Sequence, residues 1–224
     1  MKHAVLACAL ASAAAAADDG WGLYPIRPVD FSLGFSRHTL DLRAGGARFD
    51  TTVERIGITW RERYGARLQL GFTGGYSALT QTNNPVTAGR ELDGYHAGVL
   101  LDFDVLRSER AALFFNAAWL YQHVDDDDGT QRIVLSWSEP SARFGAGALL
   151  GGGLWVYGGV RHGIIDGRQR LSGAVNETQP IEQTDRTGGF AGLELVLDRE
   201  GGYAGLTAES GPDRSVGVYF GRRF

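Results

Sequence analysis

The end of the chain carries the pattern that most restricts the fold. Counting back from the last residue in steps of two gives one largely apolar row: Phe224, Arg222, Phe220, Val218 and Val216. The residues between them are mostly small or polar. Because successive side chains of a β-strand point to opposite faces, residues 214–224 are predicted to form a strand with one apolar face, which only Arg222 interrupts.

The same alternation recurs along most of the chain. It is clearest in residues 66–79, where Leu68, Leu70 and Phe72 share a face with Tyr76 and Ala78. A helix cannot place every second residue on one face, so an all-β chain of about ten strands is predicted. The expected strands are 29–42, 49–61, 66–79, 92–105, 111–124, 132–150, 154–166, 188–198, 203–209 and 214–224.

The connections between these strands alternate in length. Those after the second, fourth, sixth and eighth strands are short, and the longer ones lie among the others. Residues 167–186 are predicted to be the longest loop. The phase of alternation changes near Pro140, which predicts a bulge or an interrupting loop in that strand. The pattern does not fix which face of residues 154–166 is buried.

The first residues are typical of a secretory signal peptide. Lys2 and His3 precede an apolar run, and alanines continue to Ala17 before an acidic start at Asp18. Cleavage near residue 17 divides the chain into a signal peptide, 1–17, and a mature protein, 18–224. The only cysteine, Cys8, lies in the predicted signal, so we expect no disulfide and no cysteine metal site in the mature chain.

Composition argues against two other classes of protein. The formal net charge of -4 and the lack of a basic block do not favour nucleic acid as a partner. The uncharged run 144–160 has nearly the length of a membrane helix, but a glycine triplet at 151–153 indicates a turn between two strands. The 33 glycines are scattered through the apolar segments, as they are where strands curve sharply and pack closely.

The terminal strand resembles the C-terminal signal by which the barrel assembly machinery recognises bacterial outer-membrane proteins. The residues that carry the resemblance are Val216, Val218, Phe220 and Phe224. The resemblance implies one closed, antiparallel transmembrane β-barrel in the outer membrane of a Gram-negative cell. It also implies partners: outer-membrane lipid and lipopolysaccharide, and the assembly machinery during biogenesis. Aromatic girdles are expected from Trp60, Tyr76, Tyr95, Trp119, Tyr121, Trp137, Tyr203 and Tyr219.

Strand parity predicts which charged residues face the interior. They are Arg55, Arg61, Arg67, Asp102, Asp104, Arg143, Glu194 and Glu209, joined by Arg161 if its strand faces that way. Because lone charges in a confined lumen are costly, we expect these groups to pair in a network that fills the barrel. The alternative is a narrow or gated channel for small solutes, because ten strands are too few for a wide aqueous pore.

Two further sites are considered on the predicted loops and rims. The run Asp125, Asp126, Asp127 and Asp128 has the carboxylate oxygens that Ca²⁺ or Mg²⁺ prefers, although a solvated acidic loop is the simpler interpretation. No other cofactor is indicated. His123 with Ser136 or Ser138 and a nearby aspartate could form a rim hydrolase. Resemblance to outer-membrane proteases and lipid A deacylases is poor, so a structural or surface-binding role without catalysis is favoured.

Overall fold

The computed structural model describes residues 27–87, 89–183 and 186–224. The predicted signal peptide and Cys8 lie outside these ranges. The described residues contain no helix long and apolar enough to cross a membrane. They form twelve strands and a short 3-10 helix, η1 (Gly151–Gly153). The strands are β1 (Val29–Ala44), β2 (Ala47–Tyr64), β3 (Leu68–Thr82), β4 (Glu91–Arg107), β5 (Ala111–Asp127), β6 (Gln131–Leu150), β7 (Leu154–Gly163), β8 (Ile165–Gly173), β9 (Glu177–Gln183), β10 (Gly188–Val196), β11 (Gly202–Ser210) and β12 (Arg214–Arg223).

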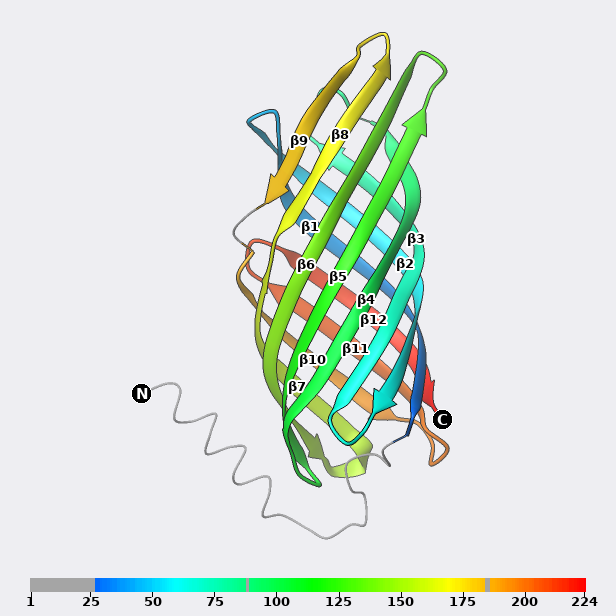
Figure 1. Cartoon of the computed structure of the whole chain (residues 1–224), viewed down its shortest axis with the longest axis vertical. Helices are drawn as coiled ribbons and strands as arrows, with labels where there is room; N and C mark the ends of the chain where they lie inside the picture. The colour runs from blue at the N-terminus through cyan, green and yellow to red at the C-terminus, as the bar shows by residue number, and fades with distance from the viewer. Residues whose placement is uncertain (1–26, 88, 184–185) are drawn as a thin grey trace, which may run out of the picture.

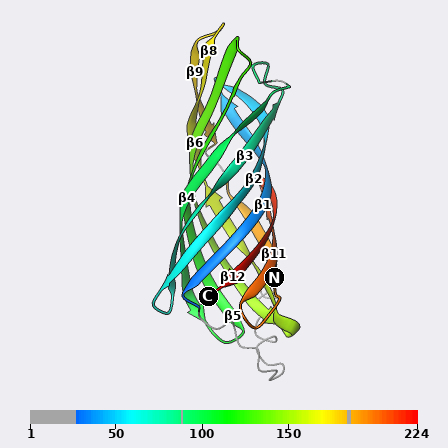
Figure 2. The ribbon, with the colours of Figure 1, turned by 90° about the vertical axis from the view of Figure 1, so that its right-hand side faces the viewer.

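The strands form one antiparallel sheet that closes on itself at two levels (Figures 1 and 2). At the level of the chain end, ten strands form a lower ring: β1 to β7 followed by β10, β11 and β12, which pairs with β1. At the other level, β8 and β9 replace β7, β10, β11 and β12, so that eight strands form an upper ring. The predicted closed barrel of about ten strands is confirmed.

The predicted loop at 167–186 is wrong for most of its length. Residues 165–171 pair with 177–183 as the hairpin β8–β9, which stands above the lower ring. Ile165, Leu171 and Ile181 point inward and are buried, whereas the outward residues are mostly polar. These short strands have only a few apolar positions between polar ones, and so the segment resembles a loop in sequence.

At Pro140 the strand that pairs with one edge of β6 changes, and the predicted bulge is absent from the described β6. β6 pairs with β5 without interruption past this residue. On its other edge, β6 pairs with β8 up to Ser138 and with β7 from Ser141. Proline lacks the amide hydrogen that a continuous ladder requires, so it fits the junction. Its carbonyl accepts a hydrogen bond from the Ile164 amide at 3.1 Å.

The apolar face of the sheet changes sides along the barrel axis. In the lower part of β1, Phe31, Leu33 and Phe35 point outward and are exposed, whereas higher up Leu40 and Leu42 point inward and are buried. The lower ring therefore presents an apolar belt outward, and the upper ring encloses an apolar core. A transmembrane strand needs about 9–11 residues, so only the lower part of the long strands spans the membrane. The upper ring extends beyond it.

The upper ring has a filled interior. Its core consists of fourteen buried apolar residues: Leu40, Leu42, Ala44, Phe49, Val53, Leu79, Leu92, Val124, Ile133, Leu135, Trp137, Ile165, Leu171 and Ile181. A barrel of about eight strands is just wide enough for side chains to fill it. Trp137, which was expected in an aromatic girdle, lies in this core because it has the inward parity of Leu135.

Aromatic side chains of the lower ring cover glycines from inside the barrel. The Tyr219 ring lies over Gly205, and the Tyr203 ring lies over Gly221 of the adjacent strand. Tyr203 and Tyr219 were expected in a girdle, and they too face inward. Trp155 and Tyr157 show that β7 turns its odd-numbered residues inward, which the sequence had left open.

We predict that Gly205→Ala destabilises the barrel. A Cβ at this position would lie 2.1 Å from the Tyr219 Cζ, so the ring would have to move off the wall. Overpacking of this kind costs about 1–3 kcal/mol. On SDS gels of samples heated to increasing temperatures, the folded barrel and the unfolded chain run as separate bands. The variant should convert from the folded band to the unfolded band at a lower temperature than the wild type. Gly151→Ala is the control, because a Cβ there has open space and the two variants should differ.

We predict that the β1–β2 turn lies outside the cell and the β2–β3 turn lies in the periplasm. The strands project far beyond the apolar belt only on the side of the β1–β2 turn. Short turns, which are typical of the periplasmic side, lie at the opposite end. A peptide tag inserted between Gly45 and Gly46 should bind antibody on intact cells. The same tag inserted after Gly65 should bind only after the outer membrane is opened. If only the tag after Gly65 bound antibody on intact cells, the orientation would be the opposite of the predicted one.

Candidate functional site

Glu139 lies at the centre of a charged layer inside the barrel. Its carboxylate is 3.1 Å from Arg55 of β2, 3.2 Å from Arg161 of β7 and 3.0 Å from Arg186, which precedes β10. On the inward face of β2, Arg55 follows the core residue Val53. The charged layer therefore lies directly below the apolar core.

Two more carboxylates complete this layer. Arg161 is 2.6 Å from Glu209 and 3.3 Å from Asp213, and Arg186 also contacts Asp213. We call Arg55, Glu139, Arg161, Arg186, Glu209 and Asp213 the ion-pair layer. Their side chains are at most 10% exposed, and three positive charges face three negative charges. Burial removes the hydration of each charge at a cost of several kcal/mol, and the pairing offsets this cost.

Two serine–histidine pairs lie near the ion-pair layer. Ser77 Oγ is 2.9 Å from His96 Nδ1, and Ser36 Oγ is 3.0 Å from His38 Nε2. Among the described residues, no carboxylate hydrogen-bonds to either imidazole. Burial of both rings, and after it the positive charge of Arg55, oppose the imidazolium that a general base must form. These pairs therefore lack the arrangement that activates a serine nucleophile.

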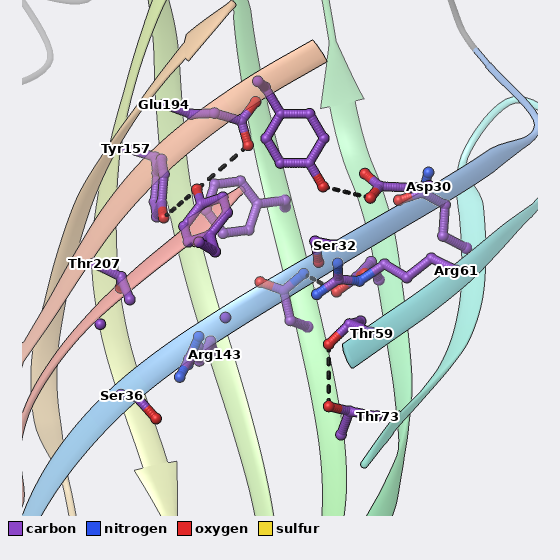
Figure 3. Close-up of a pocket in the computed structure, with 18 of the residues that line it drawn as sticks. Asp30, Ser32, Ser36, Thr59, Arg61, Thr73, Arg143, Tyr157, Glu194 and Thr207 are labelled. Carbon is purple, nitrogen blue, oxygen red and sulfur yellow. Dashed lines mark hydrogen bonds and ion pairs between the residues drawn. The ribbon is translucent and has the colours of Figure 1, made fainter. Parts of the chain in front are cut away.

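Below the ion-pair layer, the lower ring encloses a cavity of about 530 Å³ (Figure 3). The residues that line it extend from Arg55 and His96 at its top to Asp104 and Arg107 near the lower rim. Ligand sites typically have volumes of about 300–1,000 Å³. The lumen below the ion-pair layer is thus the candidate functional site.

Part of the cavity wall is organised around Arg223. Its guanidinium is 3.1 Å from Asp30 and 2.8 Å from Glu194, and it lies 4.1 Å from the centre of the Tyr203 ring. Tyr203 donates a hydrogen bond to Asp30, and Tyr219 donates one to Glu194 at 3.3 Å. This cluster joins β1, β10, β11 and β12, where the two ends of the sheet meet.

A second group of charges lies on β2, β4 and β5. Arg61 is 2.9 Å from Asp102, which also accepts a hydrogen bond from Asn116 at 2.6 Å. Nearer the rim, Asp104 is 3.4 Å from Arg63 and 2.7 Å from Arg107. The wall thus carries charged groups that are neutralised in place.

The structure brings most of the predicted interior charges together in two groups. Arg55, Arg143 and Glu209 lie in or beside the ion-pair layer, and Arg143 contacts Glu209. The cavity wall holds the others, namely Arg61, Asp102, Asp104 and Glu194. Arg67 is the exception. It is exposed in the turn between β2 and β3. Because β3 begins only at Leu68, the alternation of inward and outward side chains does not extend to Arg67.

Sequence reasoning missed the centre of the layer. Glu139 has the same parity as Trp137 on β6, a signal that was available but was obscured by the expected interruption at Pro140. Arg186 and Asp213 lie outside the strands, where parity gives no information. Their burial depends on how the top of β10 and the β11–β12 turn meet β6.

The aspartate run does not form a cation site. Asp126 and Asp128 contact Arg90, and Asp125 is 2.8 Å from Arg132. The hydroxyl of Thr130, with backbone amides, lowers the pKa of Asp128 to about 2. The described residues contain no group of three or more acidic, His or Cys side chains that could hold a metal ion. The carboxylates, including Asp127, instead stabilise the β5–β6 turn and its neighbours.

The predicted rim hydrolase is only partly assembled. His123 lies opposite Ser136 on the outer face of β5 and β6, but no hydrogen bond joins them. The imidazole instead packs 5.3 Å from the Tyr95 ring, and Asp125 pairs with Arg132. Within the ranges that the structure describes, this serine has no bonded base and this histidine has no bonded carboxylate.

The terminal strand lies in the apolar belt. Val216, Val218 and Phe220 are exposed on the outer face of β12, which pairs with β1 along its length. Phe224 is exposed, and its amide donates to the Val29 carbonyl at 2.8 Å. The strand therefore closes the barrel. Its recognition by the assembly machinery stays a prediction.

Comparison with solved structures finds other barrels. The translocator domain of the autotransporter NalP from Neisseria meningitidis is similar over 100% of this chain and 96% of its own, with a TM-score of 0.52 and 13% identity. An outer-membrane channel from Pseudomonas putida F1 is similar over 93% and 100%, with a TM-score of 0.50 and 10% identity. At these identities the likeness shows the fold alone.

The apolar belt and the closed sheet agree with these matches. The chain has the fold of the outer-membrane β-barrels. No protein-family model matches the sequence of the barrel. No curated protein matches it either.

We predict that Glu139→Gln strongly destabilises the barrel. The change leaves three buried arginines, Arg55, Arg161 and Arg186, with one negative charge fewer. Breaking a buried pair costs about 3–5 kcal/mol, so the temperature of the gel-band conversion should fall well below the wild-type value. Adding Arg55→Met should recover part of the loss, and the exposed Glu182→Gln should have little effect. An unchanged midpoint for Glu139→Gln would show that the layer contributes no stability.

Proposed function

We propose that the barrel is a non-conducting outer-membrane protein that holds a stiff β-extension above the membrane as a binding surface. The apolar core of the upper ring is the observation that carries the proposal. A conducting path through this end would have to pass Leu42, Val53 and Leu79, which are fully buried. The ion-pair layer lies below them and closes the same route.

The upper ring has the properties of a stable platform. Its eight strands are paired around the ring, and closure removes the free edges at which sheets aggregate. Its outward residues on β1 and β2 are mainly polar, including Asp41, Arg43, Arg48 and Asp50. The hairpin turns stand at its tip in Figure 1. A ligand or partner outside the cell would meet these turns first.

The two alternative functions have less support. A gated channel would have to displace both the apolar core and the ion-pair layer. A hydrolase would need a serine with a bonded base and a means of stabilising the reacting oxygen. In the described part of the chain, no carboxylate is bonded to the Ser36–His38 pair, the Ser77–His96 pair or the His123–Ser136 neighbours. The proposed role is therefore binding without catalysis.

We predict that the purified barrel produces no single-channel steps in planar lipid bilayers. An open porin prepared in the same detergent is the positive control. If Glu139→Gln still folds, it should also be silent, because the apolar core remains in place above the altered layer. Steps of defined size from the wild-type protein would contradict the proposal. Steps from the variant alone would show that the ion-pair layer, and not the core, is the seal.

A further inference from the structure

We propose that the lower lumen is a binding site for a small neutral saccharide that enters from the periplasmic end. The cavity of about 530 Å³ is large enough for a ligand of this class. Entry from above is blocked by the ion-pair layer and the core, whereas Asp104 and Arg107 line the cavity near the lower rim. The proposal depends on the suggested non-conducting function only for the side of entry.

The charges of the cavity favour a neutral ligand. Its lining contains five cationic and four anionic side chains: Arg55, Arg61, Arg107, Arg143 and Arg223, and Asp30, Asp102, Asp104 and Glu194. Each of these arginines contacts a carboxylate within 3.5 Å. An ionic ligand would compete with these pairs. A neutral hydroxyl-rich ligand could instead donate to the carboxylate oxygens and leave the pairs intact.

Aromatic rings cover the wall formed by β7, β11 and β12. Trp155, Tyr157, Tyr203 and Tyr219 lie over glycines of adjacent strands, with ring atoms 2.1–2.3 Å from where a Cβ would be. The other faces of Trp155, Tyr157 and Tyr219 are turned toward the lumen, whereas that of Tyr203 is covered by the Arg223 guanidinium. The face of an aromatic ring carries partial negative charge and attracts the weakly positive C–H groups of a sugar ring.

Hydroxyl groups cover the wall formed by β1, β2 and β3. Ser32, Ser36, Thr59 and Thr73 line the cavity there, and Thr59 donates a hydrogen bond to Thr73 at 3.0 Å. Figure 3 shows the two threonines facing each other across adjacent strands, with Tyr157 and Glu194 elsewhere on the cavity wall. Hydroxyls both donate and accept, as the hydroxyls of a saccharide do. Ring faces together with hydroxyls match a saccharide better than a purely apolar ligand.

Three sugars of similar size and different charge test the proposal. Glucose, glucuronate and glucosamine would be titrated by calorimetry into the folded barrel in an amine-oxide detergent, since a sugar-based detergent would compete. We expect saturable, millimolar binding of glucose, with at least about tenfold weaker binding of both charged sugars, a difference of about 1.4 kcal/mol. No saturable binding, or tighter binding of a charged sugar, would overturn the proposal.

Variants on one strand locate the site. Thr73→Val removes a hydroxyl from the cavity wall, and Thr80→Val makes the same change on the exposed outer face of β3. Thr73→Val should weaken glucose binding several-fold, and Thr80→Val should leave it unchanged. Equal effects would place binding outside the lumen and overturn the assignment.

Both variants would first be checked on SDS gels for the band of the folded barrel, so that a folding defect is distinguished from a binding defect. Bilayer conductance is measured separately, so failure of either proposal is recognised independently.

Discussion

The change of surroundings along the barrel axis is the constraint on which this structure depends. In the lower ring the outer face meets hydrocarbon, and in the upper ring it meets water. Each long strand must therefore exchange its apolar and polar faces partway along its length, as β1 does between Phe35 and Leu40. Closure of the sheet satisfies the backbone in both environments, because every strand has a neighbour on each side. The lumen is consequently polar below and apolar above.

The ion-pair layer lies where these two interiors meet. Buried ion pairs give little net stability, because desolvation offsets their attraction. Their value here is geometric. Glu139 accepts from three arginines that come from distant parts of the chain, and Asp213 holds two of them beside the β11–β12 turn. These contacts lie where the ring changes from ten strands to eight, immediately above the cavity. They fix the side chains at that level in one defined arrangement.

The glycines explain how a narrow barrel keeps a cavity. At several inward glycines a neighbouring ring lies against the wall, as Tyr219 does over Gly205 and Tyr203 does over Gly221. The rings cover the backbone without crossing the lumen. Below the ion-pair layer, the wall is therefore flat and aromatic on one side and lined by hydroxyls on another. This arrangement suggests a saccharide as the ligand, and the paired charges of the wall suggest that it is neutral.

The sequence by itself determined the closed barrel and the facing of most strands, because a period of two is a local property. It placed Arg55, Asp102 and Glu209 inside for the same reason. Only the tertiary structure decided that β8 and β9 continue above the membrane and that Arg186 and Asp213 join Glu139. Those contacts form between segments far apart in the chain, and turns have no periodicity from which burial can be inferred. Parity tells which way a side chain points, but only the closed sheet decides what it meets.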